Sequence, residues 1–172
     1  MGLNDGGFTN KSLGDLKDMT IDSRGLMWFV NNNHIKPSFF AYDFTNNGMN
    51  SYKSFTNQDG TEVMLNNVRC IAEDTNGNMW IGTNQGPLML ETDQITANIP
   101  IMTQVKVPRN DGTNYADYLL AGTDITACVI DKANRKWFGT GGAGIYLIGS
   151  DNISQLQHFT ASNSPLLSDN IL

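Results

Sequence analysis

The amino-acid sequence predicts an all-β fold made of repeated four-stranded sheets, and three observations support this prediction. An Asp stands six positions before a Trp in each of three stretches, 22–28, 74–80 and 131–137. The position three after each Asp is Gly or Asn, the residues that enter left-handed backbone conformations at least cost. Short runs rich in β-branched and aromatic residues flank each turn. Two such runs around an Asx–Gly-type turn predict a β-hairpin.

The turn residues and the Trp define the repeat. An Asp side chain can accept hydrogen bonds from backbone N–H groups of its own turn. A Trp is large enough to fill the gap between two packed sheets. We therefore expect structural roles for nine residues, namely Asp22, Gly25, Trp28, Asp74, Gly77, Trp80, Asp131, Asn134 and Trp137.

Each hairpin is followed by two further apolar runs that predict outer strands. They lie at 39–44 and 51–56, at 88–91 and 102–107, and at 145–148 and 154–160. Trp80 follows Trp28 by 52 positions, and Trp137 follows Trp80 by 57. Four short strands at such a period predict the blades of a β-propeller, with longer loops than in ordinary repeats of about 40–50 residues.

The repeat also suggests how the chain is organised. We expect residues 1–172 to be a single β-propeller fragment, a partial arc of about three four-stranded blades. The assignments are the end of one blade at 1–14, three blades at 15–56, 66–108 and 123–160, and the start of the next at 166–172. Closed propellers need about 4–8 blades. The expected partners therefore include the remaining propeller blades or a second copy of the chain.

Composition excludes several classes of function. Hydrophobic residues make up 40% of the chain and charged residues 16%, which is typical of a folded protein. The net charge is −6 and the 11 basic residues are scattered, so we expect no nucleic-acid partner and no anionic-membrane surface. The chain shows no signal peptide and no apolar run near the ~20 residues that cross a bilayer. We expect no membrane contact by this segment.

Two motifs suggest chemistry but fit turns better. Residues 139–144 match G-x-G-x-x-G, yet a strand-like run follows where a dinucleotide site needs a helix. Residues 74–78 resemble the opening of a calcium loop but lack its later ligands and final Glu. We expect no catalytic residue, no metal and no cofactor.

Cysteine and histidine give no site either. Cys70 and Cys128 stand four and three positions before the Asp of their repeats, so they should face opposite sides of their sheets and not form a disulfide. His34 and His158 have no Cys or carboxylate at metal-binding spacing.

Two loops stand outside the repeat, at 31–38 and 108–118. Binding residues concentrate in loops on a rigid scaffold. The second loop contains the candidate ligand-binding residues Asn114, Tyr115 and Tyr118, whose flat rings and amide suit a sugar or a peptide. The alternative is a solvated insertion without a ligand.

Residues 73–83 resemble the two-component regulator propeller repeat, whose pattern is an acidic residue, Asp, a Gly turn and Trp-Ile-Gly-Thr. The resemblance covers nearly the whole chain as three repeats and is weakest at Val30-Asn31, where Gly-Thr is expected. In that family the propeller is usually the periplasmic sensing part of hybrid histidine kinases, mostly in Bacteroidetes, and many respond to polysaccharide fragments. Residues 135–147 are also similar to the propeller protein of the type IX secretion attachment complex.

The resemblance implies a non-enzymatic sensor or recognition module that binds glycan-like or protein ligands in the periplasm or at the cell surface. The alternative is a cell-surface scaffold of the type IX secretion machinery that docks proteins or glycans. An enzyme would need a convergent His, Tyr and Arg cluster or a metal cluster, which the sequence does not indicate. No functional residue carries over, because the matched positions are structural.

Overall fold

The computed structural model describes residues 15–32, 38–64 and 67–172. In this part of the chain the elements are strands, apart from a single 3-10 turn, η2 (Thr92–Gln94). The expected all-β class is confirmed. The segment assigned to the end of a preceding blade, 1–14, lies outside the described residues.

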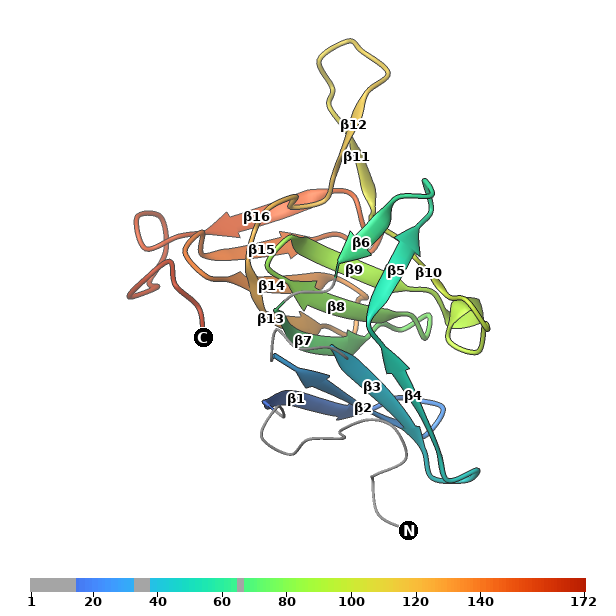
Figure 1. Cartoon of the computed structure of the whole chain (residues 1–172). Coiled ribbons are helices and arrows are strands. Elements are labelled where there is room, and N and C mark those ends of the chain that lie inside the picture. The colour runs from blue at the N-terminus through green and yellow to red at the C-terminus, as the bar shows by residue number, and fades with distance from the viewer. Residues whose placement is uncertain (1–14, 33–37, 65–66) are drawn as a thin grey trace.

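Three antiparallel sheets form the body of the molecule (Figure 1). The first contains β1 (Leu16–Ile21), β2 (Leu26–Asn31), β3 (Phe39–Asp43) and β4 (Gly48–Tyr52). The second contains β7 (Val68–Glu73), β8 (Met79–Thr83) and β9 (Gly86–Leu90). The third contains β13 (Ile125–Ile130), β14 (Lys136–Thr140), β15 (Ile145–Ile148) and β16 (Gln155–Phe159).

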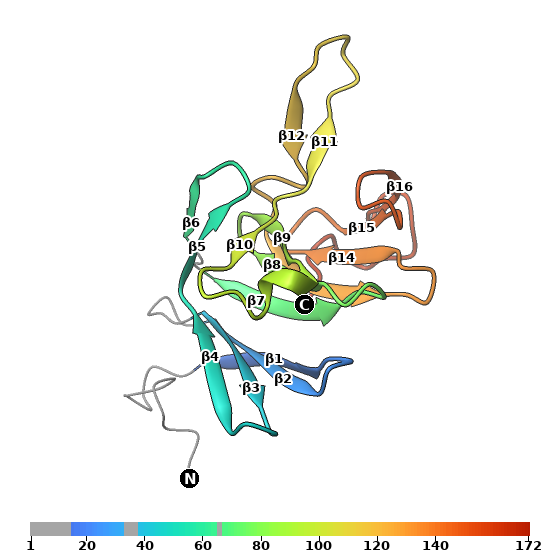
Figure 2. The same ribbon diagram turned by 90° about the vertical axis from the view of Figure 1, so that its right-hand side faces the viewer.

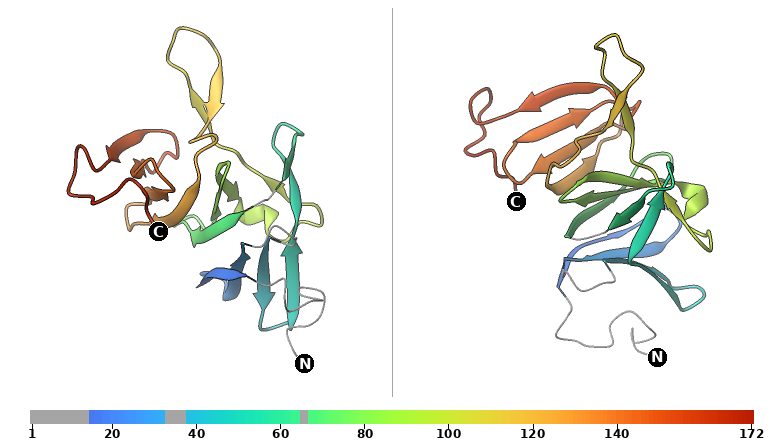
Figure 3. Two further views of the ribbon diagram at one scale, coloured as in Figure 1. Left: turned by 60° about the vertical axis from the view of Figure 1, so that its left-hand side comes forward. Right: turned by 45° about the horizontal axis from the view of Figure 1, so that its top comes forward.

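The second sheet packs between the first and the third, with β7 next to both β1 and β13 (Figure 3). Between the first and second sheets lies a cluster that includes Trp28, Phe39 and Ile81, which we call the first interface. Between the second and third sheets lies a cluster that includes Trp80 and Phe138, the second interface. Every sheet thus contributes to at least one of two apolar cores, which is where the burial free energy of the fold lies.

The second sheet departs from the predicted pattern. The strand expected at 102–107 as its fourth is wrong, because Thr103 makes only a single bridge to Met89 of β9. Two local features explain this departure. Pro87 within β9 has no N–H to donate to an outer neighbour, and Met102 is fully buried in the first interface. The segment therefore packs toward the first sheet and does not continue along β9.

A small extra sheet results, with strand order β10-β5-β6. It contains β5 (Ser54–Asn57), β6 (Glu62–Met64) and β10 (Ile101–Met102), and β10 runs parallel to β5. The first sheet's fourth strand is correspondingly 48–52 rather than the expected 51–56, because residues from 54 onward join this extra sheet. The two elements left over, β11 (Lys106–Pro108) and β12 (Ala116–Tyr118), pair only with each other.

The β11–β12 hairpin projects away from the three sheets (Figures 1 and 2). At its base, the Leu119 N–H donates to the Val105 carbonyl oxygen at 2.8 Å. We call β5, β6, β10 and the β11–β12 hairpin the accessory module. It is the part of the fold that the repeat does not account for.

Candidate functional site

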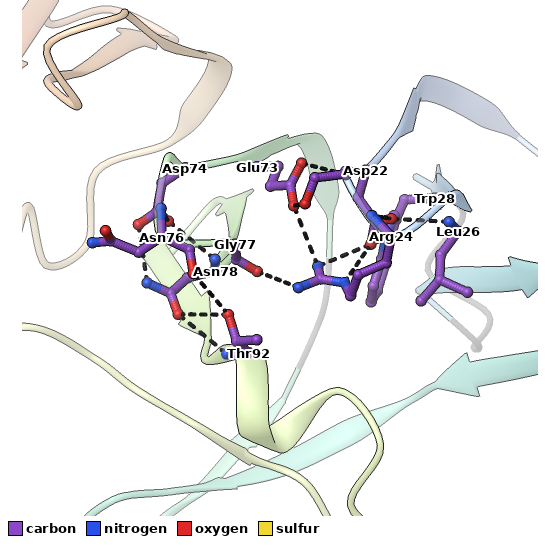
Figure 4. Close-up of polar contacts among 11 residues, drawn as sticks. Asp22, Arg24, Leu26, Trp28, Glu73, Asp74, Asn76, Gly77, Asn78 and Thr92 are labelled. Carbon is purple, nitrogen blue, oxygen red and sulfur yellow. Dashed lines mark hydrogen bonds and ion pairs between the residues drawn. The ribbon is translucent and has the colours of Figure 1, made fainter.

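Each repeat turn is built around one Asp carboxylate. Asp22 Oδ1 accepts hydrogen bonds from the backbone N–H groups of Arg24 and Leu26, both at 2.9 Å. Asp22 Oδ2 accepts the indole N–H of Trp28 at 2.8 Å (Figure 4). Gly25 closes the turn with a φ of +83°, a conformation that favours glycine. The carboxylate therefore fixes both the turn and the orientation of the Trp.

The other two turns share this contact. The distance from Asp74 Oδ2 to Trp80 Nε1 is 3.1 Å, and that from Asp131 Oδ2 to Trp137 Nε1 is 3.2 Å. Asn134 takes the left-handed position of the third turn, with a φ of +60°. Sequence reasoning missed the indole bond. The constant spacing of six between Asp and Trp is the signal that could have revealed it.

Neighbouring turns are bonded to one another. The Ser23 N–H donates to Glu73 Oε2 at 2.7 Å. The Arg24 guanidinium lies 3.6 Å from Glu73 Oε1 (Figure 4). Between the second and third turns, the Thr75 N–H donates to Asn134 Oδ1 at 3.1 Å. The polar groups of the turns are thus used to hold adjacent sheets together.

The accessory module contains a second polar network, at the base of the β11–β12 hairpin. Lys106 Nζ donates to Asp59 Oδ1 at 2.6 Å, and the Tyr118 hydroxyl donates to Asp59 Oδ2 at 2.8 Å. Asn57 Nδ2 donates to Gln104 Oε1 at 2.8 Å and to the Tyr118 hydroxyl oxygen at 3.2 Å. This network clamps the hairpin onto the β5–β6 turn.

The charges of the clamp support the same interpretation. Hydrogen bonds from Lys106 and Tyr118 lower the pKa of the Asp59 carboxyl. The bond to Asp59 in turn raises the pKa of the Tyr118 phenol. Both shifts favour a charged carboxylate facing a neutral phenol.

The tip of the hairpin has its own arrangement. Both oxygens of Asp117 accept hydrogen bonds from the Arg109 guanidinium, at 2.9 Å and 2.6 Å. The same guanidinium lies 5.9 Å from the ring centroid of Tyr115. The Tyr115 side chain is 69% exposed, and Asn114 beside it is exposed as well. The tip therefore exposes a flat aromatic ring and, on the preceding residue, a carboxamide, while the neighbouring cation is paired.

The structure separates the three candidate binding residues. Asn114 and Tyr115 lie at the exposed tip, whereas Tyr118 is half-buried at the base and bonded to Asp59. Sequence reasoning missed Asp59 itself. The turn dipeptide Asp59-Gly60 is the signal that could have predicted its hairpin. The other candidate loop, 31–38, falls mostly outside the described residues, because 33–37 are not described.

The remaining reactive side chains take structural positions. Cys70 and Cys128 face opposite sides of their own sheets, and because the sheets are neighbours both thiols point into the second interface. Both are free, and burial raises the pKa of Cys70 to about 12. His158 Nε2 lies 2.6 Å from the Ala143 carbonyl oxygen, so the imidazole is engaged with the backbone.

Neither a metal site nor a membrane span is found in the described part of the chain. Residues 15–32, 38–64 and 67–172 contain no group of three or more His, Cys, Asp or Glu side chains placed to hold a metal ion. Over the same ranges, no helix has the length and apolar character needed to cross a membrane.

Comparison with known proteins gives a family match and a set of similar folds. Residues 63–85 match the family described as Two component regulator propeller. These residues include the second repeat turn and Trp80, so the resemblance inferred from the repeat is confirmed there. None of the curated proteins matches the chain.

Among solved structures, the chain is similar to PorZ, an essential bacterial surface component of the type-IX secretion system of Porphyromonas gingivalis. The TM-score is 0.63 at 21% identity, over 90% of this chain and 28% of PorZ. It is also similar to the extracellular domain of a protein described as the hybrid two component system BT3049 of B. thetaiotaomicron. There the TM-score is 0.63 at 16% identity, over 91% of this chain and 20% of that one.

A third similar structure is the extracellular domain described as the one component system BT4673 of B. thetaiotaomicron, with a TM-score of 0.58 at 16% identity. The match covers 91% of this chain and 20% of that protein. It therefore spans between about a fifth and just over a quarter of each of these relatives. Identities this low establish the fold and not the function. The match to the two-component regulator propeller repeat thus covers residues 63–85, and the similar structures establish a β-propeller fold.

Proposed function

We propose that this chain is part of a non-enzymatic recognition module whose ligand contacts are made by the tip of the β11–β12 hairpin. The observation that carries the proposal is the exposed Tyr115 ring, held beside Arg109 on a hairpin whose base is clamped through Asp59. An aromatic group that is ordered before binding loses little conformational freedom on binding. The rigid sheets below provide the scaffold for such a loop.

The proposed ligand is a neutral glycan. A tyrosine ring offers a flat apolar face to the C–H groups of a sugar. The Asn114 carboxamide can donate hydrogen bonds to sugar hydroxyl groups and accept hydrogen bonds from them. The charge of Arg109 is already paired with Asp117, which favours an uncharged ligand over an anionic one. A protein segment rich in polar side chains is the other partner with suitable chemistry.

The proposed setting is outside the cytoplasm, as the periplasmic sensing part of a two-component regulatory system. The similarity to extracellular domains described as hybrid and one component systems supports this setting. A ligand that binds one arrangement of the module better than another would shift the population of the domains joined to it. No cofactor is required for such a mechanism.

The alternative is a cell-surface docking scaffold of the type IX secretion machinery. The similarity to PorZ and the projection of the hairpin beyond the sheets favour it (Figure 1). The two functions differ in what binding does, since a sensor passes the bound state on to the domains joined to it, whereas a scaffold docks proteins or glycans at the cell surface.

A glycan array tests the proposal. We expect the chain to bind at least one neutral oligosaccharide in a panel of xylan, mannan, glucan and chitin fragments, and Tyr115→Ala to weaken binding at least tenfold. Thr96→Ala, an exposed change on a distant loop, is the matched control and should bind as the unaltered chain does. Absence of binding across the panel, or unchanged binding by Tyr115→Ala, would contradict the proposal.

A further inference from the structure

A hollow of about 450 Å³ lies where the first sheet meets the accessory module, and we call it the side hollow. One wall is the segment 50–55, which runs from β4 into β5, and the other is the loop 95–100 between η2 and β10. Both walls lie well inside the sequence. The volume falls in the range of about 300–1,000 Å³ that small-molecule sites occupy.

The loop wall of the side hollow is held in place by its own contacts. The Ile95 side chain is buried in the first interface. The Gln94 carbonyl oxygen accepts the Ala97 N–H at 3.2 Å, and Gln94 Oε1 accepts the Ile101 N–H at 3.0 Å. A site whose walls are ordered before binding loses little conformational freedom when a ligand enters.

The opposite wall contains a buried tyrosine that remains neutral. The Tyr52 ring stacks on Phe55 with 5.7 Å between centroids, and the Tyr52 hydroxyl donates to the Ile95 carbonyl oxygen at 3.4 Å. Burial raises the pKa of Tyr52 to about 12. The phenol therefore keeps its proton at neutral pH and adds no negative charge to the side hollow.

The lining of the side hollow combines one cation with polar side chains. Lys53 is its charged residue, and the described residues that line it include no carboxylate. The side chains of Ser54 and Asn98 have no hydrogen-bond partner among the described residues. The lining thus offers one positive charge, a hydroxyl group and a carboxamide to a ligand.

Lys53 differs from most basic residues of the chain in having no partner. In the part of the chain that the structure describes, ion pairs engage Lys17, Arg24, Arg69, Lys106, Arg109 and Arg135, and Lys136 donates to a carbonyl oxygen. Lys53 and Lys132 are exposed and have neither kind of partner there. In a chain with a net charge of −6, the side hollow is therefore a place where a positive charge is available.

We propose that the side hollow binds a small hydroxylated carboxylate. The Lys53 ammonium pairs with the ligand's carboxylate, and Ser54 and Asn98 exchange hydrogen bonds with its hydroxyl groups. A single ammonium balances the single charge of a carboxylate, whereas a phosphate monoester carries about −1.5 to −2. Sugar acids and hydroxy acids that are not sugars share this chemistry. The site is separate from the hairpin tip, so the proposal does not rest on the function proposed above.

Titration of the full chain with sodium glucuronate, sodium citrate and glucose tests the proposal, with binding followed by nuclear magnetic resonance of the backbone amides. Lys53→Met removes the charge and keeps an unbranched side chain. Lys132→Met is the matched control, because Lys132 is also exposed and unpaired but lies in the third repeat turn. Tyr115→Ala, at the hairpin tip, is a second control. Circular dichroism checks that each variant is folded.

We expect at least one of the two acids to shift the amide signals of residues 50–55 and 95–100, and glucose to bind about tenfold more weakly or less. Lys53→Met should weaken binding of the acid about tenfold or more, whereas Lys132→Met and Tyr115→Ala should bind it as the unaltered chain does. Binding of glucuronate alone supports a sugar-acid site, and binding of citrate supports a site for hydroxy acids in general. No response to either acid, unchanged binding by Lys53→Met, or equal binding of glucose would overturn the proposal.

Discussion

Replacing Trp80 by Ala tests the packing on which the fold depends. The Trp80 side chain is fully buried in the second interface, and its ring faces both Phe138 and the Lys136 ammonium, which lies 5.4 Å from the ring centroid. Truncating a buried Trp to Ala costs about 3–5 kcal/mol. The loss of the cation–π contact with a buried lysine places the expected cost near the upper end. Loss of the indole hydrogen bond adds little to this cost, because Asp74 Oδ2 still accepts a hydrogen bond from Asn78.

Trp137→Ala is a matched comparison. Trp137 occupies the same repeat position and makes the same indole bond, to Asp131, but its side chain is only half-buried. We expect a cost of roughly 1–2 kcal/mol, because much of the ring is already in water. The difference between the two variants isolates the contribution of packing between sheets.

Urea unfolding followed by circular dichroism measures both costs. With a slope of about 2 kcal/mol per molar urea, a loss of about 4 kcal/mol lowers the midpoint by about 2 M. Such a loss is a large share of the ~5–15 kcal/mol that stabilises a typical domain. Equal midpoints for Trp80→Ala and Trp137→Ala would refute the claim that the Trp acts as a wedge between sheets.

Three further outcomes are expected. Gly77→Ala should lower the free energy of unfolding by about 1–2 kcal/mol, and Gly25→Ala should lower it by less. Both glycines have left-handed φ, but only at Gly77 would an added Cβ crowd neighbouring side chains, at 3.1 Å. Equal urea midpoints for the two variants would contradict this. Hydrogen bonds from Ser154 lower the pKa of Asp151 to about 2, so the ionised carboxylate stabilises the fold above pH ~4 and this stabilisation is lost as pH falls toward 2. Asp151→Asn should therefore make the free energy of unfolding fall less steeply between about pH 4 and pH 2, and an unchanged fall would exclude this role. Asp59→Ala should release the base of the β11–β12 hairpin and speed its cleavage by trypsin without a comparable loss of global stability; cleavage at the unaltered rate would show that the clamp does not hold the hairpin.

The repeat was readable from the sequence because its signals are local. The spacing of six between Asp and Trp, the Gly or Asn between them, and the alternating apolar residues all act within one hairpin. The hairpins at Asp22, Asp74 and Asp131 therefore lie where the pattern predicts them. The outer strands of the third sheet follow equally well, since each pairs with its predecessor in the chain.

The accessory module could not be predicted in the same way, because its contacts are distant in sequence. Residues around Met102 have the alternation of a strand, but the pattern does not say which strand they join. Their parallel partner lies 45 positions earlier, at Asn57. The clamp between Asp59 and Lys106 depends on that pairing and was invisible for the same reason.

The cysteines show a related limit. Counting positions correctly placed Cys70 and Cys128 on opposite faces of their sheets. What counting could not show is that opposite faces of neighbouring sheets meet, so that both thiols enter one interface. Which faces meet depends on how the sheets pack together and not on the pattern of any single strand.

Hydrogen exchange of the full chain with and without a bound oligosaccharide tests whether the accessory module is the recognition surface. We expect slowed exchange of backbone amides within the β11–β12 hairpin and the β5–β6 turn that clamps it, and little change in the three sheets. Protection confined to the repeat turns or the sheet edges, with the hairpin unchanged, would contradict it.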